Sequence, residues 1–163
     1  MSVSVAISNY SFPKHEIAIL TETDGNIDAL SQGVSDAIRE HGDLFFKIID
    51  IDETDKIVLK NHLKRIKSSG ISNIDEYRGY IDGILFVRYT HGPYRKIKIS
   101  FFTLKDLENN KELFNYTYNG VSGESITSTD AKKATIEFLN KYFHRNVILQ
   151  LDPMTHPTTV EAQ

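Results

Sequence analysis

The chain contains no cysteine among its 163 residues. Disulfides, thiolate nucleophiles and cysteine-ligated metal sites are therefore excluded together. Lack of cysteine fits a cytosolic protein and an exported one equally, so the compartment stays open on this evidence.

Long apolar runs are also missing. A membrane-spanning helix needs ~20 apolar residues, whereas the longest runs here, such as residues 84–87, have the length of a strand. Residues 1–13 lack the basic and apolar segments of a secretory signal. As it stands, the sequence predicts a cytoplasmic protein without a transmembrane segment. If an N-terminal signal has been trimmed, a periplasmic or outer-membrane-associated location is the alternative.

The motifs of common catalytic and cofactor sites are absent too. Residues 21–26 follow an apolar run and hold one glycine beside acidic residues. They do not match a phosphate-binding loop, because such loops are rich in glycine and acidic side chains would repel phosphate. The six histidines form no helical His-x-x-x-His pair and no familiar metal spacing. Residues 120–123 do not match the Gly-x-Ser-x-Gly elbow. We therefore expect no catalytic residues, no metal and no cofactor.

Charge and composition describe an ordinary globular protein. The 19 basic and 22 acidic residues give a net charge of −3, which argues against nucleic acid as the main partner because such binders carry a strong positive field. The length suits one domain with its own core. Residues 1–15 are interpreted as an N-terminal arm or edge strand, residues 16–151 as the domain and residues 152–163 as a flexible tail.

Hydrophobic periodicity predicts an α/β (α+β) domain with a mixed sheet and about three packed helices. The expected order is strand, helix, strand, helix, three strands and a last helix. The first strands, joined by helices, should run parallel, and the last three should form an antiparallel meander. A polar turn is expected at residues 106–111. The strands are expected at residues 16–20, 44–51, 84–89, 96–104 and 112–118, and the helices at residues 27–41, 53–68 and 130–143.

A row of lysines on the second predicted helix is the most distinctive surface. Its members recur at spacings of four, four and three, so they form one basic ridge. Such a ridge can bind a partner, but a solvated helix face is the simpler interpretation. A second basic patch, Arg95 and Lys96 with Lys98, lies on a predicted strand. The candidate partner-binding residues are Lys56, Lys60, Lys64, Lys67, Arg95 and Lys96.

The carboxyl ends of the predicted strands offer an alternative site, because ligands of α/β sheets bind at that edge. A small-ligand-binding protein or an enzyme would place its site there. Asp50 and Asp52 have a simpler role as helix caps that compensate the helix dipole. The candidate residues are Thr21, Asp24, Asp50, Asp52, Tyr89 and His91.

The order of elements resembles a bacterial superfamily. That superfamily contains the TolB amino-terminal domain, the curli-secretion channel lipoprotein and the outer-membrane lipoprotein activators of penicillin-binding proteins. Residues 17–20 read Ile-Ala-Ile-Leu, like its first strand. Residues 78–87 are similar to its Gly-x-x-Gly-Ala-Asp-x-Ile/Leu-Val-x-Gly motif, and residues 104–113 to its Leu-x-Asp-x-x-Thr-Gly-Glu-Ile/Leu turn. An alanine-bearing helix at residues 131–143 completes the likeness.

The resemblance implies non-enzymatic work: docking onto proteins of the cell envelope, regulating a synthase or assembling a secretion ring. The chain departs from the family in having no export signal and no cysteine for lipid attachment. We therefore expect an accessory or assembly module with a protein partner, and we leave its oligomeric state open.

Overall fold

The structure, a computed structural model, describes residues 14–64, 80–92, 95–108 and 111–144. The predicted tail, the predicted N-terminal arm up to residue 13, and Lys67 of the basic ridge lie outside these residues.

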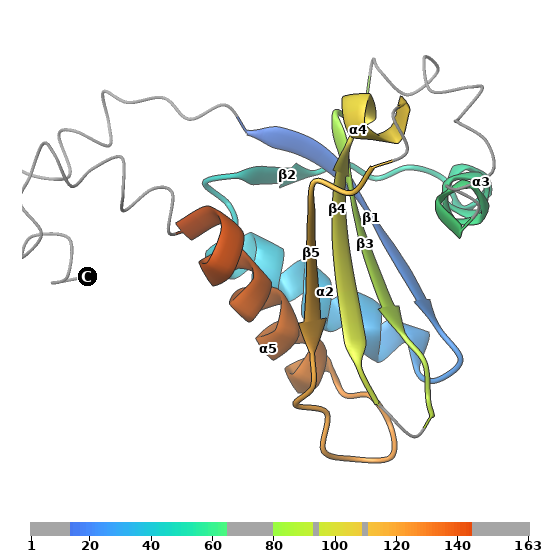
Figure 1. Cartoon of the computed structure of the whole chain (residues 1–163), viewed down its shortest axis with the longest axis vertical. Coiled ribbons are helices and arrows are strands. Elements are labelled where there is room, and N and C mark those ends of the chain that lie inside the picture. Colours follow the sequence, from blue (N-terminus) through green and yellow to red (C-terminus); the bar gives the residue numbers. More distant parts are fainter. Residues whose placement is uncertain (1–13, 65–79, 93–94, 109–110, 145–163) are drawn as a thin grey trace, which may run out of the picture.

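A five-stranded mixed sheet forms the centre of the domain, in the order β2-β1-β3-β4-β5 (Figure 1). The central β1 pairs in parallel with β2 and β3, whereas β3, β4 and β5 form an antiparallel meander. Both features confirm the predicted fold class. The strands are β1 (His15–Thr23), β2 (Phe46–Ile48), β3 (Gly83–Tyr89), β4 (Ile97–Thr103) and β5 (Phe114–Tyr118).

Helices lie on both faces of this sheet. Helices α2 and α5 cover one face, and α3 crosses the other (Figure 1). The side chains of Asn26, Asp52 and Thr127 accept backbone N–H groups at the starts of α2, α3 and α5, respectively. The helices are α2 (Ile27–His41), α3 (Glu53–Lys64), α4 (Leu104–Glu108), α5 (Ser128–Leu139) and the π-helical turn η2 (Asn140–His144).

Three predicted boundaries differ most from the structure. The first strand, predicted at residues 16–20, extends from His15 to Thr23. The turn expected at residues 106–111 begins inside α4, because the Asp106 carboxylate accepts hydrogen bonds from the backbone and hydroxyl of Thr103 and so caps a helical turn. The second strand is three residues long, not eight. Its last ladder bond runs from Ile49 N to Ile17 O (2.8 Å), after which the chain turns away toward the Asp52 cap.

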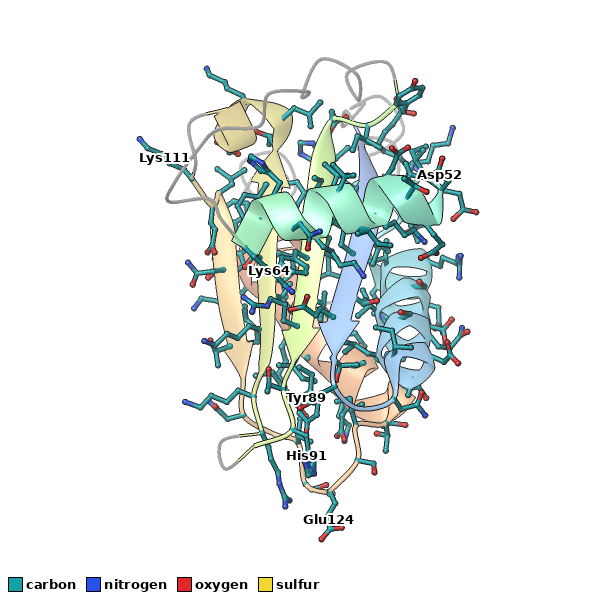
Figure 2. The ribbon with its side chains drawn as sticks, turned by 90° about the vertical axis from the view of Figure 1, so that its right-hand side faces the viewer. Asp52, Lys64, Tyr89, His91, Lys111 and Glu124 are labelled. Carbon is teal, nitrogen blue, oxygen red and sulfur yellow. The ribbon has the colours of Figure 1, made fainter. Side chains whose placement is uncertain are left out.

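Two cores of unequal size hold the layers together. The larger lies between the sheet and the α2–α5 pair and includes Tyr89, Phe101 and Phe138, all fully buried. The smaller lies under α3, where Leu59 and Leu63 cover apolar side chains of β1, β3 and β4. Helix α3 crosses only part of its face (Figure 2), and farther along β3 and β4 that face changes from apolar to charged.

Candidate binding surfaces

The uncovered part of the α3 face carries a transverse row of polar side chains. The strand registers place Glu22, Arg88, Lys98 and Thr117 opposite one another on β1, β3, β4 and β5. Arg88, Lys98 and Thr117 are exposed, and Lys64 of α3 reaches the row at Glu22. Three members of the row, Arg88, Lys98 and Thr117, line a groove.

This groove has a volume of about 530 Å³, and we call it the cationic groove. Its lining combines four cations with two threonines. No carboxylate is among the described residues that line it. The described lining residues are Arg88, Thr90, Gly92, Arg95, Lys96, Lys98 and Thr117.

Among the described residues, Arg88 shares one carboxylate with another cation and Lys98 has none. Glu22 lies 3.5 Å from the Arg88 Nε and also pairs with the Lys64 ammonium, so one carboxylate serves two cations. The Arg88 guanidinium also lies over the Phe86 ring, 5.5 Å from its centroid. Lys98 forms no ion pair within the described part of the chain. Like charges directly opposite each other on one sheet face are destabilising, so the Arg88–Lys98 pair favours an anion between or above them.

Arg95 is held in place from the far side of the groove. Its guanidinium donates a hydrogen bond to the Gly123 carbonyl (3.2 Å) in the loop before α5. Its backbone has φ of 44°, a left-handed conformation that is uncommon for a residue with a side chain. The loop contact fixes the direction of one cation of the groove.

The predicted ridge on α3 is not a free basic surface. Lys56 pairs with Glu53 at 3.3 Å, Lys60 donates to the Thr21 carbonyl at 3.3 Å, and Lys64 pairs with Glu22. These three lysines therefore point toward neighbouring groups of the fold. Of the predicted partner-binding residues that the structure describes, Arg95 and Lys96 lie in the cationic groove and Lys56, Lys60 and Lys64 do not.

The alternative site residues are not brought together. Thr21 and Asp50 line a second groove between α2, α3 and the edge of β1. Asp24 instead accepts a hydrogen bond from the backbone N–H of His91 (2.8 Å), joining the loops after β1 and β3. Tyr89 is 1% exposed within the larger core, and Asp52 caps α3. These placements leave no single cluster at the strand ends.

Perturbed titratable groups lie away from both grooves. Burial lowers the pKa of His62 on α3. A hydrogen bond to Glu137 raises the pKa of Tyr116 on β5 to about 12, and burial raises the pKa of Tyr118. Within the described ranges, no three histidine or acidic side chains gather as a metal site would require. No helix of those ranges is long and apolar enough to cross a membrane.

Three residues that line the cationic groove were not predicted from the sequence: Arg88, Thr90 and Thr117. Arg88 is the charged one among them. It follows a nearly continuous apolar run in β3, and its only signal is that it breaks that run on the face where Lys98 stands. The match between the two positions depends on the register of β3 and β4.

Comparisons with known proteins add no family to this description. No protein-family model matches the chain, and a search of curated proteins finds no match.

Proposed function

We propose that the protein is a non-enzymatic interaction module whose cationic groove binds an acidic segment of a partner protein. The observation that carries this proposal is the facing pair of Arg88 and Lys98, with Arg95 and Lys96 around the same hollow. An acidic segment would supply carboxylates where the fold supplies too few. Complementary charge of this kind speeds association and selects the partner.

A polypeptide suits the groove better than a nucleic acid. The net charge of −3 repels an extended polyanion at long range, whereas a short acidic segment engages only the local cations. Thr90 and Thr117 supply hydroxyl groups beside the cations, and these suit carboxylates and peptide carbonyls.

The resemblance to envelope accessory proteins agrees with a docking role. It is the sole support for placing that role in a bacterial envelope or secretion machine. The proposal for the cationic groove depends on its charges and not on that setting.

The test is binding of a fluorescent peptide of alternating glutamate and serine, followed by anisotropy. We expect the wild-type protein to bind and the Lys98→Glu variant to bind at least about tenfold more weakly, since reversing one charge at a desolvated contact costs on the order of 1.4 kcal/mol or more. Lys133→Glu is the matched control, because it makes the same charge change at an exposed position on α5, on the opposite face.

Equal weakening by both variants would show that net charge, and not the groove, attracts the peptide. A single-stranded oligonucleotide is titrated in parallel. If it binds more tightly than the peptide and loses affinity with Lys98→Glu, the groove is a nucleic-acid site and the proposal is wrong.

A further inference from the structure

The edge of β1 is open along most of its length. Only His15, Glu16 and Ile17 pair with β2, while β1 continues to Thr23. The backbone of β1 bonds toward β2 through His15 N and Ile17 O. Because every second residue of a strand points its N–H and C=O groups to the same side, those of Ile19 and Thr21 also point to the side of β2. Within the described chain, no backbone group of another segment bonds to Ile19 or Thr21 on that side.

Two helices enclose this open edge. Helix α2 flanks it on one face of the sheet and α3 crosses it on the other (Figure 2). Between them lies a hollow of about 300 Å³, which we call the β1-edge groove, bordered by the end of β2. The free length from Ile19 to Thr23 spans about 13 Å at ~3.3 Å per residue, enough for a short extended segment.

The walls of the groove are polar and balanced in charge. Three cations, Arg39, Lys56 and Lys60, face three carboxylates, Asp28, Asp50 and Glu53. Short hydroxyl side chains of α2, Ser31 and Ser35, leave room beside the edge. Balanced walls select neither anions nor cations, so what distinguishes the groove is its row of backbone donors and acceptors at strand spacing.

One of those backbone groups already has a substitute partner. Lys60 extends from α3 and donates its ammonium to the Thr21 carbonyl at 3.3 Å. A strand laid along β1 would supply a backbone N–H at this position and release the lysine. Lysine side chains commonly protect exposed edges in this way.

We propose that the β1-edge groove binds an extended peptide segment by strand addition, in the position that β2 would occupy if it were longer. The segment supplies alternating N–H and C=O groups to Ile19 and Thr21, as in other complexes that extend a sheet. A second copy of the chain does not fit this role, because α2 and α3 both flank the edge and bar another sheet. This site shares no lining residue with the cationic groove and does not depend on the proposed function.

The probe is a phage-displayed library of linear peptides selected on the full chain, and the best binder is resynthesised with single N-methylated amides. Strand addition uses every second peptide N–H, so we expect N-methylation to weaken binding about tenfold at alternate positions and to have little effect between them. An N-methyl scan without alternation, or failure to select any linear peptide, would overturn the proposal.

Variants of the protein test the same geometry by changing β1 and α3 instead of the peptide. Thr21→Pro removes the N–H that faces the groove without removing a bond of the β1–β3 ladder, and should abolish peptide binding. Thr21→Ala is the matched control, since it also loses the hydroxyl contact with Ser31 (2.6 Å) but keeps the N–H. Lys60→Met should tighten binding several-fold by freeing the Thr21 carbonyl.

Equal affinity of Thr21→Pro and Thr21→Ala would contradict strand addition. So would dimerisation of Lys60→Met without tighter peptide binding, because the edge would then pair with a second copy. If Thr21→Pro fails to fold, the N-methyl scan decides the question without any variant.

Discussion

Arg88 on β3 lies directly opposite Lys98 on β4, so two positive charges face each other on the part of the sheet that α3 leaves uncovered. Glu22 stands next to Arg88 on the other side and is shared with Lys64. A fold selected for stability alone has no need of this arrangement. The acidic segment that we propose as the partner would supply negative charge to this pair.

The facing cations should lower stability while no partner is bound. We predict that Lys98→Thr raises the free energy of unfolding by about 0.5 kcal/mol, because it removes a like-charge pair and places a good strand former at the position. Urea denaturation measures the change, which should shrink at high salt. Lys47→Thr on β2 is the control for the same substitution at another exposed strand position, and an equal gain there would show that strand propensity is the cause.

The crossing of α2 and α5 depends on Gly33. A Cβ added there would lie 2.3 Å from the Ser128 carbonyl oxygen and 2.6 Å from the Ala131 Cβ. Gly33→Ala should therefore destabilise the protein by about 2 kcal/mol, although alanine is the better helix former by up to ~1 kcal/mol. Gln32→Ala, one position away and exposed, should change stability far less in the same denaturation measurement. A Gly33→Ala protein as stable as wild type would mean that the helices cross farther apart.

The Tyr89 hydroxyl is buried and has no hydrogen-bond partner among the described residues. Removing it in Tyr89→Phe should leave stability unchanged or raise it by up to about 1 kcal/mol, because no hydrogen bond is lost. Tyr116→Phe, which loses a hydrogen bond to Glu137, should instead lower stability in the same thermal denaturation experiment. A clear loss in Tyr89→Phe would reveal a partner for its hydroxyl.

Tyr116 should titrate at unusually high pH. Its hydrogen bond to Glu137 favours the protonated phenol and raises the pKa from 10.0 to about 12. Because the folded-state pKa is the higher one, this stabilisation is complete below pH 10 and is lost as the pH rises toward 12. A titration followed by tyrosinate absorbance should show one phenol with this high pKa. In Glu137→Gln its pKa should fall toward the ordinary value, and in Tyr116→Phe its signal should be missing. An unchanged titration in Glu137→Gln would contradict this cause.

Local patterns were enough to predict most of the fold. The apolar run at residues 17–20 was enough to predict a strand there, and the alternation of apolar and polar residues from Ile97 to Phe101 was enough to predict another. Predicting the length of β2 required more, since its residues are as apolar as those of a longer strand. Its end is set by where the chain must turn to reach the Asp52 cap, which is a tertiary constraint.

Neither groove could be recognised before the strands were in register. The spacing of the lysines on α3 does not give the direction of their side chains. Lys64 and Lys60 point toward Glu22 and Thr21, which come from a distant strand. Arg88 likewise becomes part of a pair of facing cations only because the register places Lys98 opposite it on the next strand. The open edge of β1 exists because β2 is three residues long while β1 runs to Thr23, and the pattern predicted neither length.

The most direct test of the central claim places a photo-crosslinking amino acid at Thr117, on the floor of the cationic groove, and in a second protein at Lys133 on α5. Both proteins are expressed in the native host and irradiated, and the cross-linked products are analysed. The account predicts that position 117 captures a discrete protein through an acidic segment, that a glutamate-rich peptide competes with this capture, and that position 133 captures nothing comparable. Cross-links to nucleic acid at position 117, or the same products from both positions, would contradict it.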